Sequence, residues 1–428
     1  MPSPRCIQKR VRDIKSRSCF AKSEGYVHNA GMFFWRKKRT YLDHAGSTPE
    51  WTSSRAARAS SYRGNPGALH QEGARAKERL LEARQLLAEQ LACKSGEIVF
   101  TSGGTEGNNL AILGFARAQE EARTLSKSHI IVSAIEHPSV LDTALSLRSR
   151  GVEVDVVAPD AHGRIPPEAV RALLRLETVF VSIGWANGEI GTLQPLSAIA
   201  RELRTHGERT GKHIVFHTDV GQAPLYYSPQ VHTLGVDLAT FDAGKLGGPR
   251  GCGMLFMAQG TPIRSVFYGG SQESGLRPGT EQVSFALGFA AALAEAGVMR
   301  TREAERLKGL REHFIEDVLS RLEGTVVNGT SRAQSPNILN ISIPNIENEY
   351  VTLALDKEGF AIATKSACKE GEAESHVVRA LSGSGDTWRA RNALRVSFGR
   401  ETTRADLHRF LHALSDIVRR TYKQRVIR

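Results

Sequence analysis

Apolar and polar positions along residues 71–260 predict helices and strands in succession. The stretch Gln71–Ala92 is predicted to form an amphipathic helix, because its leucines recur near helical spacing. Short apolar or β-branched runs, each ended by a polar or glycine-rich turn, predict strands at Glu97–Thr101, His129–Ala134, Val152–Val157, Thr178–Ile183, His213–His217, Leu238–Phe241 and Cys252–Met257. Strands separated by helical stretches are typical of βαβ units, so we predict an α/β fold with a mostly parallel central sheet. Functional groups should gather at the carboxyl ends of its strands.

The pattern changes after residues 270–280. A long helix is predicted over Val283–Arg321, and a strand over Asn337–Ile343. We therefore predict a large domain at 41–282 and a smaller C-terminal α+β domain at 283–428, against which residues 41–60 can pack. The most apolar run, Phe285–Ala294, is shorter than the roughly 18 residues of a membrane span. It predicts a buried helix, and no membrane partner is expected.

The basic charge of the chain lies mostly at its N-terminus. The net charge is +12, and residues 1–40 hold eleven Lys/Arg against two acidic residues. We predict that residues 1–40 are a solvated, disordered extension, the commoner origin of such charge, and nucleic acid is not an expected partner. A nucleic-acid-binding arm, an organelle transit peptide and a true start at Met32 remain alternatives.

The cysteines are five in number and scattered, at Cys6, Cys19, Cys93, Cys252 and Cys368. None of them forms a C-x-x-C pair or a zinc-like spacing, so no metal site is predicted. This usage fits a reducing, cytoplasmic compartment with at least one thiol free for chemistry.

The segment Thr101–Glu106, which reads Thr-Ser-Gly-Gly-Thr-Glu, lies between a predicted strand and a helix expected to begin near Asn108. Backbone N–H groups at a helix N-terminus, with hydroxyls beside them, can hold a phosphate. The same residues also form ordinary helix-capping turns. The segment alone does not separate these two interpretations.

Lys245 follows the predicted strand Leu238–Phe241. A lysine at a strand's carboxyl end can reach a cleft and form an imine, although an isolated lysine is more often solvated surface. A nucleotide-binding P-loop does not fit, because Ala239 stands where its first glycine belongs and Leu246 replaces its Ser/Thr.

Three further residues follow predicted strands or lie in polar loops. Asp219 could keep a pyridine nitrogen protonated or could cap a helix. His137 could stack on a planar ring or be a buried structural histidine. Cys368 lies beside Lys369 in a polar stretch and could be a nucleophile, although an isolated cysteine is more often an inert small hydrophobe.

Many short segments from Tyr41 to Leu411 match one family in the same order. They are Tyr41–Ala45, Gly64–Pro66 with His70, Thr101–Glu106, Glu136–Pro138, Asn187–Gly191, His217–Asp219 with Gln222, Lys245 with Gly248–Gly251, Gly269–Thr280, Ser335–Asn337, Ser366–Cys368, Ser375–Val377 and Leu394–Arg400. Together they resemble the class V, aminotransferase-fold family of pyridoxal-phosphate enzymes, and specifically cysteine desulfurases with a mobile cysteine loop. The resemblance implies an aspartate-aminotransferase-like fold and an enzyme, a sulfurtransferase that uses pyridoxal 5'-phosphate.

The resemblance also implies a role for each cofactor-binding residue. Lys245 would hold the cofactor through a Schiff base and then act as acid and base. Asp219 would pair with the pyridine nitrogen, Gln222 would contact the ring hydroxyl, and His137 would stack on the ring. The phosphate would be bound by Thr105 with neighbouring amides such as that of Gly104. Thr280 would reach the phosphate of the partner subunit, which implies a homodimer.

The implied reaction removes sulfur from L-cysteine. Arg395 would clamp the substrate carboxylate, with Asn187 nearby. L-alanine would leave, and a persulfide would remain on Cys368. Acceptor proteins, such as an iron–sulfur scaffold or a tRNA-thiolation protein, would collect the sulfur.

The chain departs from the family pattern beside the lysine. The family usually has Ser-x-His-Lys, whereas this chain reads Asp242-Ala243-Gly244-Lys245. An aspartate here would set like charges together near a phosphate. Milder departures are Gly188 and Gly67-Ala68. Two alternatives remain: a selenocysteine lyase, and a catalytically silent member that acts as a binding partner in sulfur trafficking.

Overall fold

The computed structural model describes residues 39–59, 64–329, 333–364, 374–382 and 387–426. By their internal contacts, residues 39–428 form one unit. Most of the predicted basic extension and the predicted nucleophile Cys368 lie outside the described residues. The division of the folded part at residues 282 and 283 stays a prediction.

The strands of the described residues are β1 (Thr40–Tyr41), β2 (Ile98–Thr101), β3 (His129–Ser133), β4 (Glu153–Val157), β5 (Thr178–Ser182), β6 (Val215–Asp219), β7 (Leu238–Asp242), β8 (Gly253–Met257), β9 (Val326–Asn328), β10 (Ile338–Ser342), β11 (Phe360–Ala361) and β12 (Ala393–Ser397). The helices are α2 (Thr52–Arg58), α3 (Gln71–Leu91), α4 (Gly104–Glu121), α5 (Pro138–Ser146), α6 (Pro167–Leu173), α7 (Leu196–Thr210), α8 (Val231–Leu234), α9 (Val283–Arg321), α10 (Asn348–Lys357), α11 (His376–Ser382), α12 (Thr387–Arg391) and α13 (Arg404–Val426). Every predicted strand is present, with ends that agree to within two residues.

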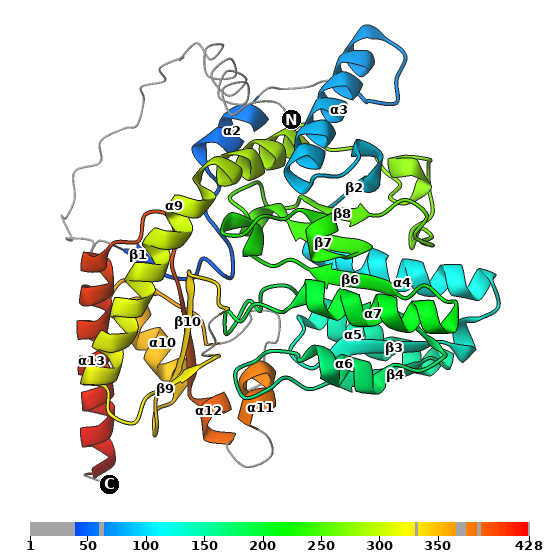
Figure 1. The fold of residues 1–428 in the computed structure, drawn as a ribbon. Helices are drawn as coiled ribbons and strands as arrows, with labels where there is room; N and C mark the ends of the chain where they lie inside the picture. The colour runs from blue at the N-terminus through cyan, green and yellow to red at the C-terminus, as the bar shows by residue number, and fades with distance from the viewer. Residues whose placement is uncertain (1–38, 60–63, 330–332, 365–373, 383–386, 427–428) are drawn as a thin grey trace. The chain divides into compact units, whose positions relative to one another are not determined.

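The central sheet has seven strands in the order β2-β8-β7-β6-β5-β3-β4. Strands β4, β3, β5, β6 and β7 run parallel, whereas β8 runs antiparallel to both of its neighbours. Helices cover both faces, because successive residues of β3 enter different cores: Ile130 packs with Phe115 of α4, and Ile131 belongs to the cluster of Ile199 on α7. The predicted α/β fold with a mostly parallel sheet is confirmed (Figure 1).

The C-terminal part of the chain builds two small sheets. Strands β9, β10 and β12 form an antiparallel sheet, and β1 pairs in parallel with β11. Because residues near position 40 pair with residues near position 360, the beginning of the folded chain joins this C-terminal part. Helices α10, α13 and the later half of α9 pack beside these sheets (Figure 1).

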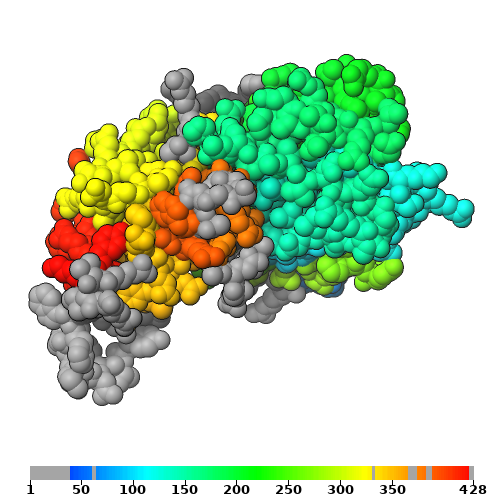
Figure 2. All heavy atoms as spheres, turned by 90° about the horizontal axis from the view of Figure 1, so that it is seen from below, coloured from blue at the N-terminus to red at the C-terminus, as the bar shows by residue number. Residues whose placement is uncertain are grey.

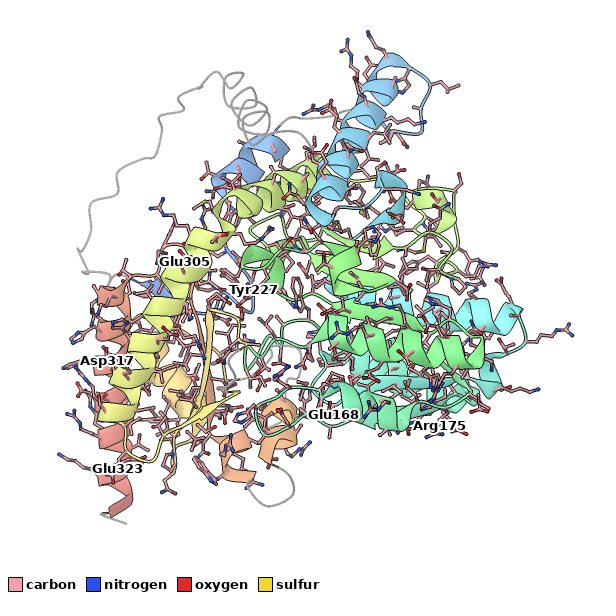
Figure 3. All side chains as sticks on the ribbon, viewed as in Figure 1. Glu168, Arg175, Tyr227, Glu305, Asp317 and Glu323 are labelled. Carbon is pink, nitrogen blue, oxygen red and sulfur yellow. The ribbon has the colours of Figure 1, made fainter. Side chains whose placement is uncertain are left out.

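Helix α9 has the bounds predicted from the sequence, Val283–Arg321. It is long and apolar enough, by composition, to cross a membrane. However, Phe289, Leu293 and Leu307 are buried in the core, while charged residues such as Glu305 and Asp317 interrupt its later half (Figure 3). This is the burial pattern of a core helix, as predicted.

Candidate active site

The carboxyl ends of neighbouring parallel strands deliver most of the predicted site residues to one cleft. His137 follows β3, Asn187 follows β5, Asp219 ends β6, and Lys245 follows β7. With Gln222 and Arg395 they line an opening whose empty space, its mouth included, is about 900 Å³. Tyr227, labelled in Figure 3, donates a hydrogen bond of 2.8 Å to the carbonyl of Gln334 and so joins the segment after β6 to the C-terminal part.

Lys245 ends the short 3₁₀ helix η5 (Ala243–Lys245), which turns the chain directly after β7. The backbone of this turn is held in place, since the Lys245 carbonyl accepts hydrogen bonds from Thr48 at 3.0 Å and Gln222 at 3.1 Å. Within the described part of the chain, the Lys245 ammonium has no hydrogen-bond or ion-pair partner. The amine lines the cleft and is available to a ligand.

Asp219 is held as an ionised carboxylate beside Lys245. Asn108 Nδ2 donates to Asp219 Oδ2 at 2.8 Å, and the Gly221 N–H donates to Oδ1 at 3.0 Å. Burial alone would raise the pKa of Asp219, but the Lys245 charge and the Asn108 hydrogen bond together lower it. A permanent negative charge therefore lies at the cleft and can accept an N–H⁺ group.

His137 combines the two interpretations weighed from the sequence. It is the N-cap of α5, because its Nδ1 accepts a hydrogen bond of 3.2 Å from the Ser139 N–H. Burial, assisted by the Lys245 charge, lowers the pKa of His137 to about 4. The ring is therefore neutral at physiological pH, and it lines the cleft while it caps the helix.

Arg395, on β12, is almost completely buried, with 3% exposure. Its Nη1 donates to the Gly188 carbonyl at 3.0 Å, and its Nη2 donates to Asp43 Oδ1 at 2.8 Å. The buried Nε has no partner among the described residues. The guanidinium thus keeps one N–H donor unused within the described part of the chain. Asn187 is less available, since its Oδ1 accepts the N–H groups of Glu189 and Ile190 and its Nδ2 donates to the Ile135 carbonyl.

Gln222 lines the cleft, but both ends of its amide are already bound within the protein. Its Nε2 donates to the His44 carbonyl at 2.6 Å, and its Oε1 accepts from Asn337 Nδ2 at 2.9 Å. The predicted contact with a ring hydroxyl requires the amide to share or exchange these partners. In this structure Gln222 fastens the turn after β1 to the segment after β6.

The predicted phosphate cradle lies at the N-terminus of α4, which begins at Gly104 and not near Asn108 as the sequence suggested. The helix extends earlier because the Glu106 carboxylate caps it, accepting the Ser102 N–H at 2.9 Å. Gly104 and Thr105 are both on the first turn. The Gly104 N–H donates to Asp242 Oδ2 at 3.2 Å, and the Gly244 N–H donates to Asp242 Oδ1 at 2.8 Å. The side chain that departs from the family pattern therefore contacts the cradle itself.

Four predicted residues are not placed at this cleft. Gly104 and Thr105, on the first turn of α4, do not line the opening. Thr280 is exposed in the segment before α9 and does not line the opening. Cys368 lies outside the described residues, but the described chain on either side of it reaches the cleft. Ala363 exchanges backbone hydrogen bonds with Arg395, and His376 Nε2 donates to the Glu136 carbonyl at 3.0 Å. Figure 2 shows the orange surface of α11 and α12 next to the green surface of the part of the chain that contains the central sheet.

Several residues of the site were not singled out from the sequence. Glu136 lies next to His137, and burial raises its pKa to about 8, so its carboxyl group is protonated at neutral pH. Its Oε1 accepts the Gly184 N–H at 2.8 Å. Asn108 joins Asp219 to Ser139. Glu136 is part of the Glu-His-Pro segment, but only burial reveals its protonation state.

The two described cysteines are poor candidates for a nucleophile. Burial raises the pKa of both Cys93 and Cys252 to about 12. Neither lines the cleft beside Lys245. The described cysteines therefore offer no rival to Cys368 at this site.

Comparisons with known proteins show the family of this chain. The aminotransferase class V family model matches residues 40–410. The cysteine desulfurase IscS of Dictyoglomus turgidum is 36% identical over 386 residues, which cover 89% of this chain and 95% of the relative. A solved NifS-like protein superposes with a TM-score of 0.81 at 30% identity, covering 89% of this chain and 99% of its own. The structure titled SspA in complex with cysteine has a TM-score of 0.70 at 28% identity and covers 84% and 98%.

The chain therefore belongs to the aminotransferase class V family. Curated relatives such as those of Dictyoglomus turgidum and Archaeoglobus fulgidus are named cysteine desulfurases, and the predicted fold and the predicted enzyme type are both confirmed.

Proposed function

We propose that this chain is a pyridoxal-phosphate-dependent cysteine desulfurase that passes sulfur from L-cysteine to Cys368. The observation that carries the proposal is the meeting of Lys245, Asp219 and Arg395 in one cleft. An amine, a carboxylate and a guanidinium are the groups needed to hold an aldehyde cofactor, its ring nitrogen and an amino-acid carboxylate. The relative whose title names a complex with cysteine supports the same substrate class.

The residues at the ring end of the cleft fit pyridoxal phosphate. The Lys245 amine has no described partner, and the ionised Asp219 lies close enough for the Lys245 charge to lower its pKa. When bound, the cofactor supplies an electron sink for the carbon that carries the substrate's amino group. At the cofactor's other end, the Thr105 N–H would bind the phosphate, together with the Gly104 N–H, which already donates to Asp242.

Each residue near the ring has a defined task. Asp219 would accept a hydrogen bond from the protonated ring nitrogen and remain an anion, because Asn108 and Gly221 hold both of its oxygens. His137 presents a neutral face, since protonating it requires a pH near 4. Lys245 moves protons at its Nζ, which no described side chain sequesters. Gln222 approaches the ring hydroxyl from the buried network that it already forms.

Arg395 would bind the substrate carboxylate. Arg395 lines the cleft and keeps one unpartnered donor, its Nε, and its contact with the Gly188 carbonyl places it beside Asn187. Because the guanidinium is buried, its hydrogen bonds are stronger than they would be in water. The pair with Asp43 orients the group before the substrate arrives.

Cys368 would accept the sulfur. Its thiolate forms a bond to the substrate's sulfur as the carbon–sulfur bond breaks, and the carbon takes a proton, which gives L-alanine and a persulfide. Thr364 is the last described residue before it, and four residues of chain span at most about 14 Å. Because neighbouring Ala363 pairs with Arg395, this reach covers the cleft.

The remaining expectations concern partners. We propose a homodimer in which Thr280 serves the partner's site, in keeping with its exposed position away from its own cleft. A sulfur-acceptor protein, such as an iron–sulfur scaffold or a tRNA-thiolation protein, would take the persulfide. The setting that we propose is cytoplasmic.

The test is to measure visible absorbance and product formation on the full-length chain. We expect a yellow band after incubation with pyridoxal phosphate that changes on adding L-cysteine, with release of L-alanine. The band should be absent in Lys245→Ala and retained in Lys212→Ala, an exposed lysine away from the cleft. A colourless protein that releases no alanine would favour the silent binding partner. Comparing turnover of L-cysteine with that of L-selenocysteine separates the desulfurase from a selenocysteine lyase.

A further inference from the structure

The N-terminus of α4 already carries an anion that belongs to the protein. Asp242 Oδ2 accepts the Gly104 N–H, which is the first N–H of this 18-residue helix. The carboxylate also lies against Gly103, since a Cβ built on that glycine would be 3.5 Å from Asp242 Oδ2. The positive end of the helix dipole is thus occupied in the way that a bound phosphate would occupy it.

The charge of Asp242 is not cancelled by a basic side chain. Its two oxygens accept only the backbone N–H groups of Gly104 and Gly244, and within the described part of the chain no Lys or Arg forms an ion pair with it. Arg250, which lies near Gly244, donates instead to Ser47 Oγ at 3.0 Å. An arriving phosphate therefore meets a full negative charge at the N–H group that it would use.

A phosphate oxygen bound to the Gly104 N–H would lie within about 4 Å of the Asp242 carboxylate, a distance at which like charges repel strongly in a partly buried site. The first turn still offers Thr105, whose N–H has no acceptor among the described residues. The ring end, with Lys245 and Asp219, is unaffected by this conflict. The ring end of the cleft and the N-terminus of α4 thus differ in their complementarity to the cofactor.

We propose that Asp242 sets the cofactor selectivity of this chain by competing with the cofactor's phosphate at the N-terminus of α4. Lys245 and Asp219 bind the aldehyde group and the ring of the cofactor, while its phosphate adds little affinity. Unphosphorylated pyridoxal and pyridoxal phosphate therefore bind with similar strength. This inference rests on the proposed function, because it assumes that the cleft takes a pyridoxal compound.

The experiment measures equilibrium binding of pyridoxal phosphate and of pyridoxal to the full-length apoprotein, by the change in visible absorbance. In the unmodified chain we expect the two dissociation constants to agree within about tenfold. Asp242→Asn removes the charge but keeps an acceptor for Gly104 and Gly244, and Asp242→Ser supplies the hydroxyl of the family pattern. Both variants should lower the dissociation constant of pyridoxal phosphate by about tenfold or more, since one fewer charge opposes the phosphate. The dissociation constant of pyridoxal should stay unchanged.

Asp237→Asn is the matched control. Asp237 lies directly before β7, at the opposite end of the strand from Asp242, and accepts the Phe216 N–H at 2.8 Å. Asp237→Asn changes the net charge by the same amount as Asp242→Asn, but it should leave the preference for pyridoxal phosphate over pyridoxal unaltered. A gain in Asp237→Asn equal to that in Asp242→Asn would reduce the effect to overall charge and overturn the proposal.

Other outcomes also decide the matter. A preference for pyridoxal phosphate above about a hundredfold in the unmodified chain, or no gain in either Asp242 variant, would overturn this inference and leave the proposed function intact. If no variant binds either compound, the proposed function and this inference fail together. The unmodified chain alone gives a decisive reading even if a variant does not fold.

Discussion

Arg395 Nη2 and Asp43 Oδ1 form an ion pair of 2.8 Å between residues 352 positions apart in the sequence. The arginine is 3% exposed on its side chain, whereas the aspartate is 26% exposed. An aspartate therefore already shares the guanidinium that we propose for the substrate carboxylate. Substrate binding and protein stability depend on the same group.

Replacing Arg395 by lysine should weaken substrate binding more than catalysis. Lysine keeps the charge but cannot donate to Asp43, Gly188 and a carboxylate together, because it lacks the planar fork. We expect KM for L-cysteine to rise by about tenfold to a hundredfold, with a smaller change in kcat. Steady-state kinetics measures both. Arg311→Lys is the control, a buried arginine that contacts the Ile338 carbonyl away from the cleft, and it should leave KM unchanged. A fall in kcat at constant KM would contradict the assignment.

Asp43→Asn should have the opposite effect on KM. The amide still accepts the Arg395 hydrogen bond, but it no longer repels a substrate carboxylate that uses the same guanidinium. We expect KM to fall by about threefold to tenfold, and the free energy of unfolding to drop by roughly 1 kcal/mol for the partly exposed pair. Asp356→Asn, in an exposed pair with Arg39, should change neither. An unchanged or higher KM would show that Asp43 only orients the arginine.

Glu136 should make the apoprotein less stable as pH rises. Burial raises the pKa of Glu136 to about 8 from an ordinary value of 4.5. Between these values the folded chain holds a proton that the unfolded chain releases, so the free energy of unfolding falls as pH increases. Glu136→Gln removes this loss of stability. We expect its free energy of unfolding to exceed that of the unmodified chain by roughly 2 to 4 kcal/mol at pH 8, with little difference near pH 4.

Thermal or denaturant unfolding from pH 4 to 8 checks this expectation. Glu305→Gln, at an exposed position on α9, should follow the unmodified chain throughout. If the curves of Glu136→Gln and the unmodified chain run parallel across the range, the carboxyl group is ionised in the folded state and the assignment fails.

Thiol reactivity should separate Cys368 from the described cysteines. Because burial raises the pKa of Cys93 and Cys252 to about 12, only about one molecule in 10⁵ carries a thiolate at either position at pH 7. Alkylation followed by peptide mapping should therefore label Cys368 well before these two. Cys368→Ser should abolish persulfide formation, whereas Cys93→Ser should retain it. Persulfide formation that survives in Cys368→Ser would require another acceptor.

The sequence was sufficient for the parts of the fold that depend on local pattern. The bounds Val283–Arg321 follow from helical periodicity, and the strands follow from short apolar runs ended by turns. The sequence pattern predicts the start of α4 too late, because the Glu106 side chain, which accepts the Ser102 N–H, gives no periodic signal. Local rules also do not show that β8 reverses direction within a parallel sheet.

The sequence predicts which residues belong to the candidate site, but not the hydrogen bonds that they form or their protonation states. Lys245, Asp219, His137 and Arg395 were identified from their order in the chain, and the fold brings them to one cleft. Gln222 and Asn187 donate hydrogen bonds to backbone carbonyls of loops that are distant in the sequence, and only the folded structure brings these loops together. The protonation of Glu136 depends on burial, and the contact of Asp242 with Gly104 joins residues 138 positions apart.

The joining of residues 40–45 to the C-terminal strands also constrains how the enzyme can be made. The Ser397 N–H donates to the Leu42 carbonyl at 2.8 Å, and Ser397 Oγ accepts the Ala45 N–H at 2.8 Å. At ribosomal rates of about 5–20 residues per second, these early residues wait about 20 to 70 seconds for their partners. During synthesis the nascent chain can complete much of the large sheet while the wall of the cleft formed by Asp43 and Arg395 is still missing. Translation must pass β12 before the chain can acquire a substrate site, so products truncated before β12 should accumulate as inactive protein.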